Sequence, residues 1–240
     1  MKLKEKFSNE YGPQKMVKNY LDLVKKHLNK DSVILDAGCG EGGVFSKSDL
    51  NKKGKRKTLI GIDLCKEKNP YVDKKFIGSL DKLPFKDSTF DVIICEWVVE
   101  HLEYPELVFN EFSRVLKKEG HLILFTPNVW NPLVFFSKII PSSLKDAILK
   151  KFVGKEDNDL FPVFLRCNSV RSINKVAIIS GFKNEFLKTY HNADYFAYSR
   201  FLQKLLIYTY LFLIKFRLLG FTKMYILASY KNFKVDKRLR

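Results

Sequence analysis

A glycine-rich loop between two short apolar runs constrains the fold of this chain more than any other feature of its sequence. The run VILDA is followed directly by Gly38, Gly40 and Gly43, and a second run, TLIGID, ends at Asp63. Glycines at this spacing let a backbone turn sharply and approach a ligand closely. A carboxylate about 20 residues later, at the tip of the next strand, can accept hydrogen bonds from both hydroxyls of a ribose. The segment therefore predicts a strand, loop and strand unit that binds a cofactor containing adenosine.

Asp36 separates the two common cofactors of this kind, because the spacing up to Asp63 suits NAD as well as S-adenosylmethionine. A carboxylate two residues before Gly38 would face a dinucleotide pyrophosphate with like charge. The same carboxylate can attract the ammonium group of a methionine moiety, directly or through water. Asp36 therefore favours S-adenosylmethionine.

Further short apolar runs predict that the two strands belong to a larger parallel sheet. The runs cover residues 74–78, 90–95 and 121–126, and Gly, Asp or Pro residues bound them. Because they lack polar alternation, they are typical of strands that helices cover on both faces. Amphipathic helices are predicted at 14–28 and 105–118. Alternating strands and helices indicate an α/β fold with a Rossmann-like, doubly wound sheet.

Less regular segments fill the rest of the chain. The connection after the glycine loop allows about two helical turns before Gly54. Two short helical candidates on either side of Pro141 predict a helical insertion after the fifth strand. Two later apolar stretches, 182–190 and 222–230, can complete a mainly parallel, seven-stranded sheet. We therefore expect a single domain over residues 1–240, made of a cofactor-binding core (14–127), a helical insertion or lid (128–167), and C-terminal helices and closing strands (168–230).

Four motifs within roughly residues 14–130 resemble the class I S-adenosylmethionine-dependent methyltransferases of the type 11-like group. They are LDAGCGEGG, GIDL, GSLDKLPFKDSTFDVIICEWVVEHL and RVLKKEGHLILFTPN. The resemblance implies S-adenosylmethionine as cofactor and S-adenosylhomocysteine as product. The residues that it implies for the cofactor are Asp36, Ala37, Gly38, Cys39 and Gly40 at the methionine end, Asp63 at the ribose, Leu64, Ser79 and Leu80 at the adenine, and Cys95, Glu96 and Trp97 near the sulfonium.

Ser79 departs from the pattern of the group. Relatives usually carry Asp at this position, where it contacts the adenine amino group. A serine hydroxyl can still accept a hydrogen bond, although more weakly than a carboxylate. The departure implies a weaker hold on adenine, and it leaves a catalytically silent cofactor-binding protein as an alternative.

The candidate catalytic residues are His101 and Glu100. In methyl transfer the cofactor supplies the reactive carbon, so the protein mainly positions donor and acceptor and excludes water. An oxygen or nitrogen acceptor must also lose a proton, and His101, with Glu100 beside it, is the candidate base. Within the group this Glu-His pair is often structural instead, which is the alternative for both residues.

The formal net charge of +17 raises the question of a nucleic-acid partner. Only eight of the 43 basic residues are Arg, whose fork binds phosphate in a bidentate manner. The segment after the fourth strand reads CEWV, whereas enzymes that methylate a flipped base carry an Asn/Asp-Pro-Pro-aromatic loop there. We therefore expect O- or N-methylation of a small-molecule, sugar or lipid-linked acceptor, with an RNA methyltransferase as the alternative.

Candidate substrate residues lie after the fifth strand. Arg166 can grip a phosphate or carboxylate, or it can hold its loop to an acid such as Asp159. Asn128 is the second candidate. The four cysteines have no metal-ligand spacing, so no metal site is expected.

The segment 197–218 is rich in apolar and aromatic residues. If it forms one helix, a partly basic stripe runs along an otherwise apolar cylinder, made of Arg200, Lys204, Tyr208, Leu211 and Lys215. This pattern suits a helix in a membrane interface, or one that packs on the sheet or on a second subunit. No apolar run reaches the ~18 residues of a membrane span, and no secretory signal precedes the first helix. We expect a cytoplasmic protein, with peripheral membrane contact and the oligomeric state left open.

Overall fold

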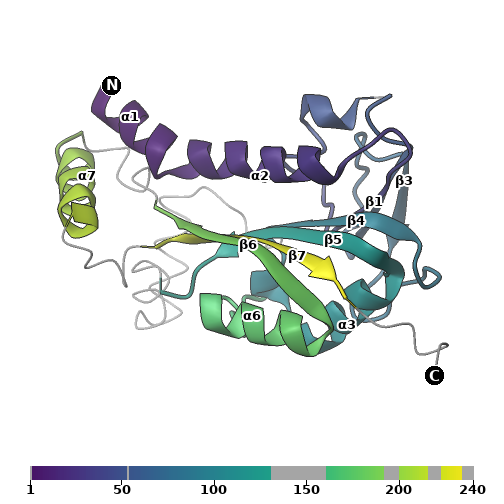
Figure 1. Cartoon of the computed structure of the whole chain (residues 1–240). Coiled ribbons are helices and arrows are strands. Elements are labelled where there is room, and N and C mark those ends of the chain that lie inside the picture. The colour runs from purple at the N-terminus through teal and green to yellow at the C-terminus, as the bar shows by residue number, and fades with distance from the viewer. Residues whose placement is uncertain (1, 53, 131–160, 192–199, 216–222, 234–240) are drawn as a thin grey trace.

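A seven-stranded sheet forms the centre of the protein (Figure 1). The computed structural model describes residues 2–52, 54–130, 161–191, 200–215 and 223–233. Within them the strand order is β3-β2-β1-β4-β5-β7-β6. The strands are β1 (Val33–Ala37), β2 (Thr58–Asp63), β3 (Lys74–Ile77), β4 (Phe90–Glu96), β5 (Leu116–Pro127), β6 (Phe182–Tyr190) and β7 (Tyr225–Asn232).

Strands β1 to β5 pair in parallel, and β7 is antiparallel to both β5 and β6. This arrangement confirms the predicted Rossmann-like, mainly parallel seven-stranded sheet. Residues 131–160 of the predicted insertion after the fifth strand lie outside the described residues.

Helices cover both faces of the sheet (Figure 1). On one face lie α2 (Pro13–His27) and, at its N-terminal end, α1 (Lys2–Glu10). On the other face lie α3 (Pro105–Val115) and α6 (Val170–Ile179). Alternate strand residues supply the two cores: Ile93 of β4 packs on the α3 side and Ile94 on the α2 side. Because both faces are buried, the strands needed no polar residues, which explains their continuous apolar runs.

The boundary between α3 and β5 differs from the prediction. The helix expected at 105–118 ends at Val115, and Leu116 already pairs with Phe90 of β4. The Asn232 side chain from β7 donates hydrogen bonds to the carbonyl oxygens of Ser113, Leu116 and Lys117. These bonds satisfy carbonyls at the helix end that another helical turn would otherwise satisfy.

The connection after the glycine loop also differs from the prediction. In place of about two helical turns, it contains one 3₁₀ turn, η1 (Asp49–Asn51). The Ser48 hydroxyl donates to the Phe45 carbonyl, and the Asn51 amide donates to the Ser46 carbonyl. Such local side-chain bonds compete with the helical backbone pattern. The prediction of two helical turns was therefore wrong.

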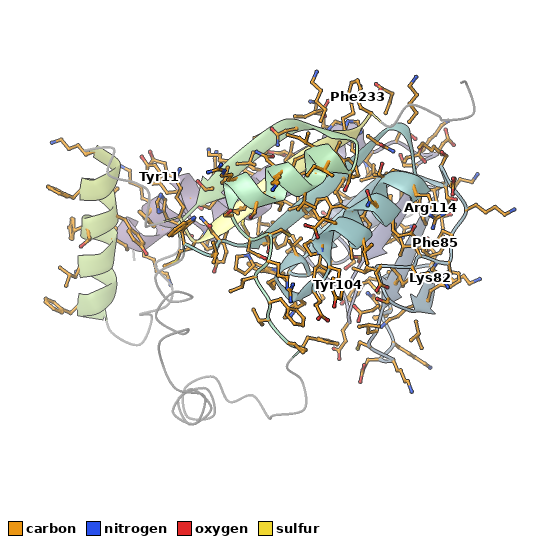
Figure 2. All side chains as sticks on the ribbon, turned by 90° about the horizontal axis from the view of Figure 1, so that it is seen from below. Tyr11, Lys82, Phe85, Tyr104, Arg114 and Phe233 are labelled. Atoms are coloured by element: carbon orange, nitrogen blue, oxygen red, sulfur yellow. The ribbon has the colours of Figure 1, made fainter. Side chains whose placement is uncertain are left out.

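The predicted helix 197–218 is present as α7 (Arg200–Lys215), and residues 197–199 and 216–218 lie outside the described chain. Both views place α7 beyond one end of the sheet (Figures 1 and 2). It packs on α1, where the rings of Tyr210 and Phe7 stack with centroids 5.8 Å apart. None of the described helices combines the length and the apolar character needed to cross a bilayer.

Candidate cofactor site

A cavity of about 570 Å³ opens at the carboxyl ends of β1, β2 and β4. This is the edge at which ligands bind in doubly wound folds, because the loops that follow parallel strands meet there. Several predicted cofactor residues line the cavity together with the candidate base: Gly38, Gly40, Asp63, Leu64, Ser79, Leu80, Trp97 and His101. These predicted residues therefore lie together at one cavity, and their contacts with a cofactor stay a prediction.

Gly38 and Gly40, in the loop after β1, have backbone conformations that other residues rarely adopt. Gly38 has φ +76°, and a Cβ atom there would overlap the Cγ2 atom of Val98. The amides of Gly38 and Cys39 both donate to the Ile62 carbonyl, at 2.8 and 3.2 Å, which ties the loop to β2. Gly40 has φ +42°, and apart from its chain neighbours no heavy atom of the described residues lies within 4 Å of where its Cβ would be. Among the described residues, the loop therefore leaves open space beside its backbone.

Asp63 holds this loop in place from the tip of β2. Its Oδ2 accepts from the Gly40 amide at 2.8 Å, and its Oδ1 accepts from the Cys65 amide at 2.8 Å. A carboxylate has about four acceptor sites, so two remain for a ligand in the cavity. Asp63 can therefore shape the loop and accept hydrogen bonds from a ribose at the same time.

Five other predicted cofactor residues are not among the described lining residues. They lie at the end of β1, within the loop and at the end of β4, and they are Asp36, Ala37, Cys39, Cys95 and Glu96. All five are buried. Burial raises the pKa of the Asp36 carboxyl well above its usual value, and the charges of Glu96 and Asp63 add to the shift. Burial also raises the pKa of the Cys39 thiol to about 12, so this thiol stays protonated at neutral pH.

Glu96 makes contacts that the sequence did not reveal. Its Oε1 accepts from the Tyr20 hydroxyl at 2.6 Å and from the Phe45 amide at 2.9 Å, and its Oε2 accepts from the Val44 amide at 2.5 Å. A Cβ atom on Gly43 would overlap Oε2. Burial raises the pKa of the Glu96 carboxyl, against the opposite effect of these hydrogen bonds. Glu96 therefore anchors the segment after the glycine loop to α2 and β4.

Trp97 forms one wall of the cavity from a strained backbone position. Its φ is +58°, a region that non-glycine residues rarely occupy. The Trp97 amide donates to the Phe125 carbonyl at 3.1 Å, and its ring packs edge-on against Phe125 and Tyr225. The side chain remains 40% exposed. Strain of this kind persists only where surrounding contacts hold it, and it is concentrated at functional sites.

His101 lies in the 3₁₀ turn η2 (Val99–His101) at the cavity wall. Its Nδ1 is 2.8 Å from the Pro162 carbonyl oxygen. Because a carbonyl only accepts, Nδ1 carries the proton, and in the neutral ring Nε2 keeps its lone pair. The pairing also holds residues 161–165 beside the cavity, which Phe161 and Phe164 help to line.

Glu100 is buried and is not among the described residues that line the cavity. Its carboxylate accepts from the Thr126 hydroxyl at 2.9 Å, and Thr126 in turn accepts from the Asn168 amide at 2.6 Å. Its backbone carbonyl accepts from the amides of Phe164 and Leu165. Burial raises the pKa of the Glu100 carboxyl. These bonds give Glu100 a structural position between β5 and the 161–165 segment.

The two candidate substrate residues lie outside the cavity lining. Arg166 is exposed and sits over the rings of Tyr104 and Phe164, with distances of 5.9 and 5.8 Å to their centroids. Both rings line the cavity, so Arg166 stands near its rim. Asp159, its alternative partner, is outside the described residues. Asn128 is buried, and its side-chain amide donates to the Lys223 carbonyl at 2.9 Å.

Comparison with known proteins finds a methyltransferase domain in this chain and relatives of similar sequence. Residues 35–124 match the family described as a methyltransferase domain. An uncharacterized protein of Methanocaldococcus jannaschii is 34% identical over 149 residues, which cover 58% of this chain and 63% of that protein. The mitochondrial ubiquinone biosynthesis O-methyltransferase of Saccharomyces cerevisiae is 26% identical over 174 residues, which cover 64% of this chain and 54% of that enzyme. The chain thus spans less than two thirds of the length of either relative.

A solved structure shows the same fold. The crystal structure of geranyl diphosphate C-methyltransferase from Streptomyces coelicolor, in complex with Mg²⁺, geranyl diphosphate and S-adenosyl-L-homocysteine, superposes with a TM-score of 0.57 at 16% identity. The superposition covers 92% of this chain and 79% of that enzyme. Together with the motifs and the sheet order, these matches show that residues 35–124 form a methyltransferase domain and that the fold is the one of the class I S-adenosylmethionine-dependent methyltransferases.

Proposed function

We propose that the protein transfers a methyl group from S-adenosylmethionine to an oxygen or nitrogen atom of a small-molecule, sugar or lipid-linked acceptor. The observation that carries the proposal is the arrangement of Asp63 and Gly40 at the cavity wall. The carboxylate that fixes the loop amide also keeps acceptor sites for a ribose. The open space beside Gly40 leaves room for the amino-acid end of the cofactor.

The cofactor would lie along this wall. The glycine loop would hold its methionine end, with the Asp36 carboxyl beneath the loop. Burial raises the pKa of this carboxyl, and the nearby ammonium group of the cofactor would oppose that shift by favouring the charged form. Leu64 and Leu80 would contact the adenine, and the Ser79 hydroxyl would take the place of the Asp that relatives usually carry. When bound, the cofactor supplies an electrophilic methyl group on a sulfonium.

His101 would act as the base for the acceptor. Its Nδ1 is held by the Pro162 carbonyl, so Nε2 can accept the proton that the acceptor oxygen or nitrogen gives up. Glu100 would position this turn through Thr126 and through the 161–165 backbone, without touching the reacting atoms.

The cavity walls support an acceptor with an apolar or aromatic part. Trp97, Tyr104, Phe161 and Phe164 all line the cavity, and such rings bury apolar surface and stack on flat groups. The yeast relative acts in ubiquinone biosynthesis, and the structural relative is named for geranyl diphosphate. Arg166 at the rim would pair with an anionic group of such an acceptor.

The surface of α7 supports a peripheral membrane contact. Ile207 and Tyr210 are buried against the body of the protein. The stripe predicted from the sequence needs correction, because Leu211 packs on the core while other residues form the exposed face. That face is an apolar line of Phe201, Leu205, Tyr208 and Phe212, which are between 53% and 75% exposed.

These four side chains follow one another at steps of four, three and four, so they share one side of the helix. Exposed Lys204 and Lys215 flank the line, and α7 contains no acidic residue. An apolar face with lysines along its edge suits a helix that lies in the head-group region of an anionic bilayer. Figures 1 and 2 show α7 at the outer end of the described part of the molecule, beyond the end of the sheet.

Flotation with liposomes tests the membrane contact. The wild-type protein should float with phosphatidylglycerol vesicles at low salt, and Phe201→Ser/Phe212→Ser should remain in the pellet fraction. Phe233→Ser is the matched control, because it removes an exposed aromatic ring far from α7 (Figure 2). Equal flotation of all three proteins would remove α7 as the contact.

Calorimetry tests the enzymatic proposal. The protein should bind both S-adenosylmethionine and S-adenosylhomocysteine, and Asp63→Ala should weaken both by about 1–3 kcal/mol through lost charged hydrogen bonds. Asp31→Asn, at an exposed carboxylate outside the cavity lining, serves as the control. Unchanged affinity in folded Asp63→Ala would refute the role of this residue.

Label transfer identifies the acceptor class. Methyl-labelled cofactor would be incubated with lipid extract, polar metabolites and total RNA in parallel. Label in the lipid or metabolite fraction supports the proposal, and label in RNA would favour the alternative. Binding of both cofactor forms without transfer to any fraction would point to a catalytically silent binding protein.

A further inference from the structure

A second cluster of reactive side chains lies away from the cavity. It consists of His27 at the end of α2, His121 in β5 and Glu185 in β6. In the sheet, His121 pairs with Val92 near the start of β4, whereas the cavity opens beyond the end of that strand. The cluster therefore belongs to neither the cofactor wall nor the candidate base.

The three side chains converge on one point. The Nε2 atom of His121 lies 3.1 Å from Oε2 of Glu185, and the Nε2 atom of His27 lies 4.0 Å from the same oxygen. One ligand atom from each residue falls within 4.8 Å of the other two. The imidazole side chains are 10% and 14% exposed and the carboxylate side chain is 30% exposed, so the cluster is mostly enclosed but open on the carboxylate side.

Metal binding requires a change of protonation at His121. Its Nε2 atom lies 3.1 Å from the Glu185 carboxylate, which only accepts, so Nε2 carries a proton that must move to Nδ1 or to solvent before this atom can bind an ion. The rings of His27 and His121 stack with centroids 3.6 Å apart and an interplanar angle of 21°. Burial lowers the pKa of His27 to about 4 and also lowers the pKa of His121, so both rings are neutral at pH 7. A neutral imidazole offers a nitrogen lone pair to a metal ion.

We propose that His27, His121 and Glu185 form a binding site for a zinc ion. Two imidazole nitrogens and one carboxylate oxygen are a ligand set that zinc prefers, whereas Mg²⁺ and Ca²⁺ prefer oxygen ligands alone. Water would complete the coordination from the open side. Because the two rings are nearly parallel, the His27 ring must turn to direct its lone pair at the ion.

The surrounding charges set the strength of this site. Lys26 and Lys231 lie close enough to affect the two imidazoles, and their positive charges oppose a cation. Lys231 is already paired with Glu119, which offsets part of that effect. Glu185 brings the negative charge that favours the ion.

Zinc at this site would join three elements that are far apart in the sequence. It would link the end of α2 to β5 and β6. The same helix carries Tyr20, which holds Glu96 beneath the segment after the glycine loop. The ion would therefore stabilise the face of the fold on which the cofactor loop rests, without taking part in methyl transfer.

Zinc binding can be measured on the full chain without any acceptor. Protein treated with chelator and then freed of it would be titrated with Zn²⁺ by calorimetry, and thermal unfolding would be recorded with Zn²⁺ and with Mg²⁺. We expect about one zinc bound and a higher Tm in Zn²⁺ but not in Mg²⁺. Loss of an outer partner of a ligand typically lowers metal affinity by about 10–100-fold, so replacement of one ligand itself should lower the zinc affinity by at least about 100-fold.

The variants separate this site from other zinc ligands. Glu185→Gln keeps the shape of the least buried ligand and is the first test, and His27→Ala and His121→Ala follow. Cys65→Ser is the matched control for the partly exposed thiol and should leave zinc binding unchanged. Co²⁺ absorption provides a second readout, since loss of a nitrogen ligand changes its d–d bands. Absence of zinc binding to folded wild-type protein, or equal binding by wild type and a folded His27→Ala/His121→Ala variant, would overturn the proposal.

Discussion

Replacement of Glu96 by Gln tests whether a buried carboxylate anchors the cofactor loop. The change keeps the size of the side chain and removes one of its two acceptor oxygens. The Oε1 atom accepts from Tyr20 and Phe45, and Oε2 accepts from Val44. A glutamine amide has one acceptor oxygen, so its NH₂ group must face at least one of these donors.

The structure allows the cost to be worked out. A lost hydrogen bond to a charged acceptor costs about 1.5–3 kcal/mol, and a buried N–H group left without an acceptor adds about 1–3 kcal/mol. Part of this cost is recovered, because burial raises the pKa of the Glu96 carboxyl and the variant no longer ionises a buried group. We expect a net loss of about 2 kcal/mol in the free energy of unfolding, which for a chain of this size lowers Tm by roughly 4–8 °C.

Urea unfolding at pH 7, followed by circular dichroism, measures this loss. Tyr20→Phe is the matched control, because it removes one donor and leaves both backbone donors paired, and it should cost about 1 kcal/mol. A Glu96→Gln variant as stable as the wild type would refute the anchoring role. Calorimetry gives the second readout: weaker cofactor binding at unchanged stability would assign Glu96 to direct cofactor contact, as the family resemblance implies.

Three further predictions concern the site and its support. Gly38→Ala should lower both Tm and cofactor affinity, since φ +76° costs a non-glycine residue about 1–2 kcal/mol and the new Cβ overlaps Val98; thermal unfolding and calorimetry check this. Once an acceptor is known, His101→Gln should reduce kcat by about 10²–10⁴-fold and leave the cofactor Kd unchanged, as steady-state kinetics would show. The hydrogen bond from Arg114 lowers the pKa of Glu111 in the folded protein. The pair therefore stabilises the fold fully above the unfolded-state pKa of Glu, and this stabilisation is lost as pH falls through the lower folded-state pKa. Glu111→Gln should therefore lower the free energy of unfolding by about 1 kcal/mol at pH 7 and leave it unchanged below that folded-state pKa. Urea unfolding across pH measures this difference. Arg114 also donates to the Phe85 carbonyl, and Figure 2 shows the two residues side by side.

Local sequence patterns predicted the elements around the site well. The strand predicted at 58–63 is β2 with the same bounds, and the helix predicted at 14–28 is α2 within one residue at each end. A buried parallel strand needs an unbroken apolar run, and a loop at positive φ needs glycine, so both can be read from a few neighbouring residues. The positions of Gly38 and Asp63 on the cavity wall follow from the same short-range information.

The same patterns were less informative about which way a side chain faces at a strand end. Cys95 and Glu96 belong to the motif that predicts the cofactor site, but both are buried and neither is among the described lining residues. Glu96 meets the amides of Val44 and Phe45, 52 and 51 residues away in the sequence. No spacing rule relates these partners, because they become neighbours only after β1 and β4 have paired.

The sequence by itself determined the strand, glycine loop and strand unit, the type of cofactor and the fold class, because these depend on short repeats of polarity and on the conformations that glycine allows. Tertiary structure alone decided the place of β7 between β5 and β6, the end of α3 under Asn232, and the meeting of His27, His121 and Glu185. In each of these cases the partners are separated by tens of residues or more. A hydrogen-bonding or metal-ligating group meets such a partner only where the packed sheet and helices bring the two together.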